Sequence, residues 1–196
     1  MNRQFLKLKS SIMIPGVTES VNLRKYFLES YANPPDTRIY FTGDFYELIE
    51  QGGYPTLPRK TDPLPPTTIV SFEPLPSPSN KMDIYNELPK NFVFEDPTSF
   101  LVRLKWLLDN ENKGNYFKIR FMSDEQRAAL PVMNLLPFCG YNSFFVRINN
   151  EIYHFVVYLV GTRSDYCWWQ VHAWHPNRSK GAIWPGAKNL IFSSSP

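Results

Sequence analysis

The sequence predicts an α+β protein whose C-terminal part is an antiparallel β-meander packed against helices. Two features support this class. Apolar and polar residues alternate in three segments within 143–174, as they do in half-buried strands. The segment 97–110 places its large apolar residues at helical spacing. A small N-terminal α+β segment and a proline-rich connector come before them.

Composition divides the chain into three regions. Proline accounts for 18 of the 196 residues, and eight of these prolines lie between Tyr54 and Pro78. We expect an N-terminal α+β segment at 1–53, a proline-rich connector at 54–80 and a main α+β domain at 81–196, or all three in one compact domain. The apolar run 67–73 interrupts the connector and is expected to be a short edge strand, because proline is excluded from central strands.

The N-terminal region shows alternating strand and helix signals. Thr18 is a helix-capping residue, and the prolines after Asn33 would stop a helix. Gly52 and Gly53 supply the left-handed backbone that ends many helices. The expected elements are a strand at 4–14, a helix from 18 to about 31, a strand at 38–41, and a helix from 42 or 43 through 49.

The clearest predicted helix follows the connector. Asp96 is a capping residue, and Pro97 takes the first helical position, where the N–H that it lacks would have no partner. The residues that fall on one apolar stripe are Phe100, Leu101, Leu104, Leu107 and Leu108. The helix is expected to end near Asn110, before a polar turn.

Two further elements are expected before the meander. Residues 115–121 alternate as a strand. Ser123 and Gln126 form a capping box that starts a helix over 123–136, which Pro131 ends or kinks. This helix and the helix at 97–110 are expected to cover one face of the meander.

The meander is expected to contain strands at 143–148, 151–160 and 166–174. A two-residue Asn149–Asn150 turn pairs Ile148 with Glu151 and therefore places Phe145 opposite His154. A five-residue loop at 161–165 would pair Val160 with Tyr166 and place His154 opposite His172. The resulting apolar face consists of Phe144, Val146, Tyr153, Phe155, Val157, Leu159, Cys167, Trp169, Val171 and Ala173. A slip of one residue would destroy this face, which supports the register.

The opposite face mixes aromatic and polar side chains. Its members are Phe145, Arg147, His154, Val156, Tyr158, Tyr166, Trp168, Gln170, His172 and Trp174. This composition suits a face that is half covered or that meets a partner, since aromatic residues and arginine anchor interfaces. We expect the binding residues to be Phe145, Arg147, His154, His172 and Trp174. The tail 175–192 either returns as a last strand or docks elsewhere.

Composition argues against several classes of protein. The net charge is +3 without basic runs, well short of a dedicated nucleic-acid binder, although Lys118, Arg120 and Arg147 beside sheet aromatics could serve a single strand. The longest apolar run, 155–161, is too short to cross a membrane, and the N-terminus lacks a signal-peptide pattern. We therefore expect a cytoplasmic protein that makes no contact with membranes.

The sequence offers residues for a metal site and for a cysteine nucleophile, but no phosphate-binding motif. His154, His172 and His175 carry the ring nitrogens that bind metals, but no spacing matches a known site, so we expect no metal. No glycine-rich phosphate motif occurs, so we expect no cofactor. Cys139 with His154 as base, oriented by Gln170 or Asp165, gives the alternative of a cysteine-dependent hydrolase. The preferred hypothesis is a non-catalytic interaction or adaptor protein that binds a protein partner through the aromatic face and the tail.

Overall fold

The protein has a mixed α+β architecture dominated by one sheet. The structure, a computed structural model, describes residues 6–22, 39–41, 61–74, 79–80, 93–118, 141–148, 150–163, 166–174, 183–184 and 189–194. Within these ranges the helices are α3 (Pro97–Asp109) and α4 (Glu111–Gly114). The strands are β1 (Leu6–Ile14), β2 (Ile39–Phe41), β3 (Thr67–Pro74), β4 (Ser79–Asn80), β5 (Tyr141–Ile148), β6 (Glu151–Arg163), β7 (Tyr166–Trp174), β8 (Ile183–Trp184) and β9 (Asn189–Ser194).

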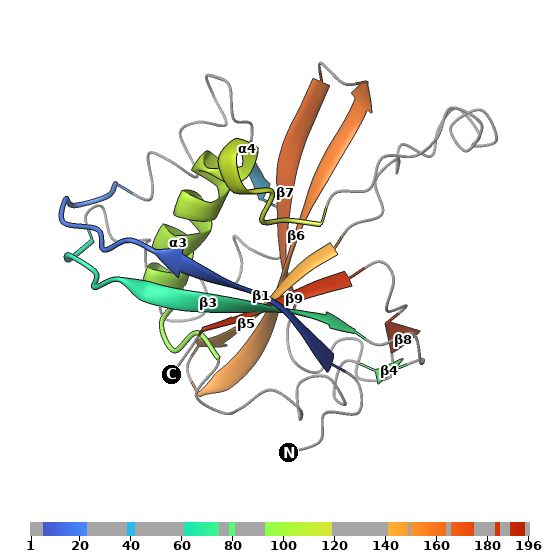
Figure 1. The fold of residues 1–196 in the computed structure, drawn as a ribbon, viewed down its shortest axis with the longest axis horizontal. Coiled ribbons are helices and arrows are strands. Elements are labelled where there is room, and N and C mark those ends of the chain that lie inside the picture. Colours follow the sequence, from blue (N-terminus) through green and yellow to red (C-terminus); the bar gives the residue numbers. More distant parts are fainter. Residues whose placement is uncertain are drawn as a thin grey trace.

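Seven of the described strands form one sheet in the order β1-β3-β9-β5-β6-β7-β2, and β4 pairs with β8 in a separate pair (Figure 1). The predicted antiparallel meander β5-β6-β7 is confirmed. It continues into strands from both ends of the chain, with parallel pairs β5–β9 and β2–β7. Strands from all three predicted regions thus share one sheet, while the boundaries of those regions stay a prediction.

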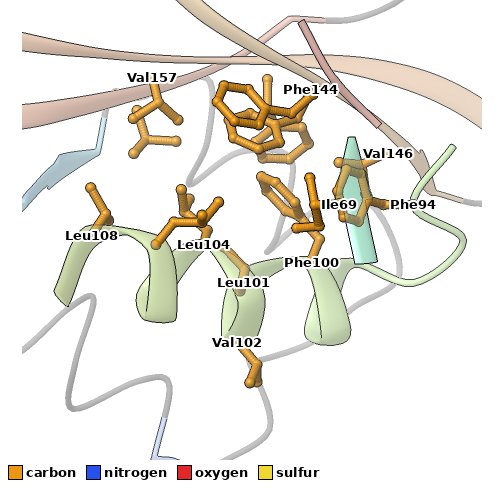
Figure 2. Close-up of a cluster of buried hydrophobic side chains, with 14 of the residues drawn as sticks. Ile69, Phe94, Phe100, Leu101, Val102, Leu104, Leu108, Phe144, Val146 and Val157 are labelled. Carbon is orange, nitrogen blue, oxygen red and sulfur yellow. The ribbon is translucent and has the colours of Figure 1, made fainter. Parts of the chain in front are cut away.

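Helix α3 covers one face of this sheet. Asp96 caps it as predicted, since its Oδ2 accepts a hydrogen bond from the Ser99 N–H at 2.6 Å. The whole predicted stripe is buried. Figure 2 shows Phe100, Leu104 and Leu108 directed from α3 toward the sheet. There Phe100 meets the rings of Phe144 and Phe155, at centroid distances of 5.3 and 4.9 Å.

The first hairpin has the predicted register. Ile148 pairs with Glu151 and Phe145 pairs with His154. The turn residue Asn150 has φ 66°, the left-handed conformation that a tight hairpin requires.

The predicted register of the second hairpin is wrong. His154 lies opposite Trp174 rather than His172, and His172 lies opposite Val156. Strand β6 continues to Arg163, with an irregularity between Gly161 and Arg163, so two residues instead of five separate it from β7. Because the shift is two residues, the described side chains of β6 and β7 keep their predicted faces.

Strand β3 differs from its prediction, and the end of the tail takes one of its two predicted courses. The segment 67–73 was predicted as an edge strand, but β3 lies between β1 and β9. The end of the tail returns to the sheet as β9, where Ile191 and Phe192 are fully buried between β3 and β5. Proline does not interfere, because Pro74 stands at the last position of β3.

Three local predictions need correction. The helix expected from Thr18 is absent over 18–22, and the preceding residue, Val17, forms a bridge with Leu64. The polar turn after α3 contains the short helix α4. Residues 115–118 form no strand, because the Asn115 N–H donates to the backbone oxygen of Glu111 and side chains accept from the N–H groups of residues 116–118. The rest of the expected first helix, the helices at 42–49 and 123–136, and residues 119–121 of the expected strand lie outside the described residues.

Candidate functional site

The candidate site is a row of aromatic rings on the sheet face opposite α3. Alternate residues of a strand point to opposite faces, so Phe144 and Phe155 face α3 while Phe145 and His154 face away. The rings in successive contact, which we call the aromatic ladder, are Phe145, His154, Trp174, His172, Tyr158 and Tyr141.

The buried end of the ladder is formed by Phe145 and His154. Their rings are stacked with centroids 5.3 Å apart and an interplanar angle of 18°. They are only 2% and 1% exposed. Trp174, the cross-strand neighbour of His154, meets its ring edge-on at 5.4 Å. A partner could therefore not touch Phe145 or His154 directly in this arrangement, and these two rings instead hold Trp174 in place.

The outer end is formed by Tyr158, His172 and Tyr141. The rings of Tyr158 and His172 stack at 5.2 Å, and Tyr158 Oη hydrogen-bonds to His172 Nε2. Both side chains are half-buried, and Tyr141 is 37% exposed. The ladder thus has buried rings at one end (Phe145 and His154), half-buried rings in the middle and the exposed Tyr141 at the other end.

The electrostatics of the outer end keep Tyr158 neutral. Burial, and then the neighbouring Tyr141, raise the pKa of Tyr158 to about 12. At neutral pH Tyr158 is a phenol whose hydroxyl is engaged with an imidazole, rather than a phenolate nucleophile or base.

Arg147 lies on the same strand face as Phe145, beyond the buried end of the ladder. Its Nε donates to Glu95 Oε2 at 2.7 Å. The short segment carrying Glu95 bridges to β5, because the Phe94 N–H donates to Phe145 O at 3.0 Å and the Arg147 N–H to Phe94 O at 2.7 Å. The Arg147 side chain is 34% exposed and that of Glu95 is 59% exposed. The positive charge of Arg147 is therefore paired with the carboxylate of Glu95.

The predicted catalytic residues do not come together in the described part of the chain. Cys139, Asp165 and His175 lie outside it, as does the side chain of Cys167. Gln170 lies opposite Tyr158, next to the ladder rather than beside His154. The hydrolase alternative thus stays a prediction without a geometric observation behind it.

Tyr141 and Tyr158 are the ladder residues that the sequence-based choice of binding residues missed. Tyr158 was assigned to the correct face but not selected, and the strand was expected to begin at Ser143. Extending the first-hairpin register by two residues would have placed Tyr141 across from Tyr158, where their rings lie 5.6 Å apart. The register of the first hairpin was therefore the feature of the sequence that could have identified Tyr141 as a neighbour of Tyr158.

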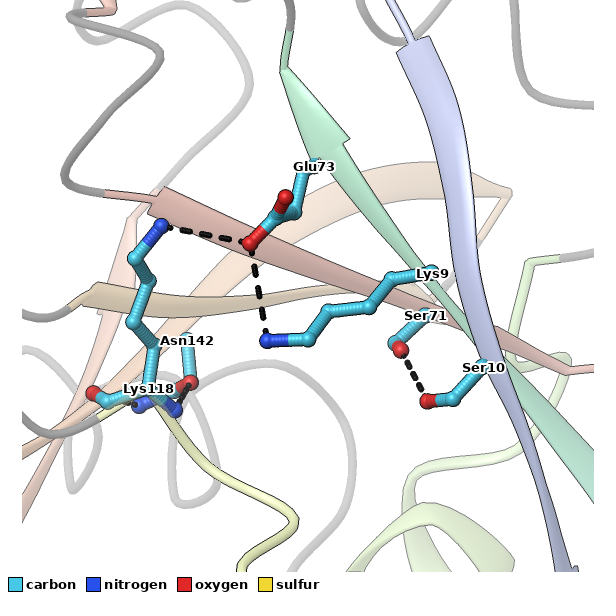
Figure 3. A network of polar contacts seen from close by, with 6 residues as sticks. All are labelled: Lys9, Ser10, Ser71, Glu73, Lys118 and Asn142. Atoms are coloured by element: carbon cyan, nitrogen blue, oxygen red, sulfur yellow. Dashed lines mark hydrogen bonds and ion pairs between the residues drawn. The ribbon is translucent and has the colours of Figure 1, made fainter.

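A polar network lies on the α3 side of the sheet (Figure 3). Glu73 Oε1 lies 3.5 Å from the Nζ atoms of both Lys9 and Lys118. Burial raises the pKa of Glu73, but Lys118 and Lys9 outweigh it, so the net shift is downward. These pairs are partly exposed and contribute little to stability. The amide of Asn142 is buried, and its Oδ1 accepts a hydrogen bond from the Lys118 N–H at 2.8 Å. A buried hydrogen bond of this kind contributes more to stability than the exposed ion pairs do.

The histidine, cysteine and carboxylate side chains and the helices of the described residues give no second candidate site. No described group of three His, Cys, Asp or Glu side chains could hold a metal. No helix in the described ranges has both the length and the apolar character needed to cross a bilayer. No protein-family model, curated protein or solved structure matches the chain.

Proposed function

We propose that the protein is a non-catalytic interaction protein that binds a protein partner through the outer end of the aromatic ladder. The observation that carries this proposal is the unbroken series of ring contacts across β5, β6 and β7, with buried rings at one end and the exposed Tyr141 at the other. Tyrosine and tryptophan are the residue types that most often dominate binding energy at protein interfaces.

Preorganisation supports the same proposal. Trp174 and His172 are half-buried and touch neighbouring rings on both sides, so they would lose little side-chain freedom on binding. Tyr158 and His172 also keep polar atoms beside apolar ring surface, which suits an interface with a wet rim. In this proposal Phe145 and His154 support the contact surface, and Arg147 lies beyond its buried end.

The test begins by identifying the partner in cells. A photo-crosslinking amino acid replaces Tyr141 in the full chain, and the crosslinked proteins are identified by mass spectrometry. The matched control carries the same group at Met13, which is 76% exposed on β1 at an edge of the sheet. We expect a protein that crosslinks from position 141 and not from position 13.

Binding of the purified partner is then measured with variants. Trp174→Ala and Tyr141→Ala should each raise Kd by about tenfold or more, the loss of affinity typical of interface anchors. Met13→Ser should leave Kd within about twofold. Circular dichroism checks that each variant is folded. Unchanged affinity in both folded ladder variants, or identical crosslinking from positions 141 and 13, would contradict the proposal.

A further inference from the structure

Glu111, the first residue of α4, carries a buried carboxyl group that the proposed function does not use. The residue is 7% exposed. Its Oε2 accepts hydrogen bonds from the backbone N–H groups of Tyr116 at 2.8 Å and Phe117 at 3.1 Å. Between Glu111 and Tyr116 the chain reverses direction at Asn115, which has φ 48°. One carboxyl oxygen thus closes the turn that leads from α4 back to the core.

The segment held by Glu111 is packed into the core through its aromatic rings. Phe117 is 6% exposed and lies 4.8 Å from the ring of Trp169 and 5.7 Å from that of Phe192. The ring of Tyr116 lies 5.5 Å from that of Trp106 on α3. The turn therefore joins α3 and α4 to strands β7 and β9.

The same segment is also bound to the central strands through Asn142. Figure 3 shows the Asn142 amide beside the backbone of Lys118. Its Oδ1 accepts from the Lys118 N–H, and its Nδ2 donates to Lys118 O at 3.3 Å and to Val157 O on β6 at 3.1 Å. Residues 116–118 are consequently joined to β5 through Asn142 and to β7 and β9 through Phe117, on the face opposite the aromatic ladder.

We propose that Glu111 is a proton-operated clasp, in which the protonated side chain keeps residues 116–118 closed on the core and loss of the proton favours their local opening. The inference goes beyond the proposed function and does not depend on it, since it concerns the closure of this segment whether or not a partner binds.

Two effects act on the Glu111 carboxyl in opposite directions: burial favours the neutral form, and the two N–H donors favour the ionised form. Burial raises the pKa of Glu111 from its ordinary value of 4.5 to about 7, outweighing the two backbone N–H bonds, which lower it. In an open segment the carboxyl would return to water and to its ordinary pKa. The closed state therefore binds the proton more tightly. The stabilisation from this proton is fully present below about pH 4.5 and is lost as pH rises through about 7.

No described charged side chain replaces Glu111 in this role. On its own and the neighbouring helix, Lys113 Nζ contacts Asn110 Oδ1 and Asp109 pairs with Lys105. On the clasped segment, Lys118 reaches Glu73. The neighbours of Phe117 on β7 and β9 are the uncharged rings of Trp169 and Phe192. The causes that shift the pKa of Glu111 are burial and backbone hydrogen bonds alone.

Amide hydrogen exchange of the full chain tests the clasp. The protection factors of the Tyr116 and Phe117 amides, corrected for intrinsic exchange, are measured between about pH 5 and about pH 8. We expect them to fall by on the order of tenfold or more as pH rises. In Glu111→Gln, whose amide oxygen can still accept both N–H bonds but does not titrate, we expect no such fall. Glu19→Gln, which changes an exposed carboxylate, should behave as wild type.

Three outcomes would overturn the proposal. One is a flat wild-type profile, and another is a fall that persists in Glu111→Gln. The third is an equal fall at the amides of β6, which would report global unfolding rather than local opening. If Glu111→Gln does not fold, the carboxyl carbon of Glu111 is followed by NMR in the wild-type protein. A midpoint near 7 supports the clasp and a midpoint near 4.5 contradicts it.

Discussion

The two faces of the seven-stranded sheet are formed by alternate residues of the same strands, and helix α3 packs on one of them. On one face, α3 lays Phe100 and Leu104 against Phe144 and Val157, and all four residues are at most 1% exposed. On the other face the aromatic ladder runs from buried rings to a Tyr141 that is 37% exposed. The face covered by α3 is filled by buried apolar side chains. A face left half-covered keeps hydroxyl, imidazole and indole groups that can serve both the fold and a partner.

The largest expected effect is the loss of stability when an aromatic ring is removed, and it should differ between the two faces. Phe100→Ala removes a ring that contacts Phe94, Phe144 and Phe155, so we expect it to lower the free energy of unfolding by about 3–5 kcal/mol. Trp174→Ala, which truncates a half-buried ring, should lower it by about 1–2 kcal/mol. Urea unfolding followed by circular dichroism measures both changes. Equal losses would mean that the ladder face is as much a core as the face under α3.

The second prediction tests how far water is excluded from the ladder. The pKa of Tyr158 is raised above its ordinary value of 10.0 to about 12, mainly by burial. The folded state therefore holds this proton more tightly than the unfolded state does. The associated stability is present below about pH 10 and lost as pH rises through about 12. Phenolate absorbance is followed during a pH titration of wild type and of Tyr158→Phe. The difference between the two curves gives the titration midpoint of Tyr158. A midpoint near 10 would show that the outer ladder is open to water.

The smallest effect is expected at Arg147. Its pair with Glu95 is partly exposed, so Arg147→Ala should change the free energy of unfolding by less than about 1 kcal/mol. Arg147→Lys should lie between the alanine variant and wild type, because it keeps the charge but loses the planar guanidinium. A loss above about 2 kcal/mol in urea unfolding would show that Arg147 belongs to a buried interface rather than to the rim of the ladder face.

Local signals predicted the elements that depend on neighbouring residues. Asp96 and Pro97 start α3 because the cap and the first helical turn lie within a few residues of each other. The first hairpin has its predicted register because a two-residue turn leaves one way to pair its strands. This register also fixed Phe145 opposite His154, the buried pair of the candidate site.

The second hairpin shows where such reasoning stops. An irregularity between Gly161 and Arg163 moves the pairing by two residues, so the predicted contact of His154 with His172 becomes a contact with Trp174. Alternation along a strand cannot detect a shift of two, because both registers keep the same residues on the same face. The burial of Phe145 and His154 was likewise not visible in the alternation.

The sequence by itself determined which residues share a face of β5, β6 and β7, and which residues of α3 turn toward the sheet, because both follow from short repeats along the chain. Only the tertiary structure decided that β9 lies between β3 and β5, that β3 is an inner strand, and that Glu111 closes the turn before Phe117. These outcomes depend on contacts between segments that are distant in sequence or on burial in the assembled core. Local periodicity carries no information about either.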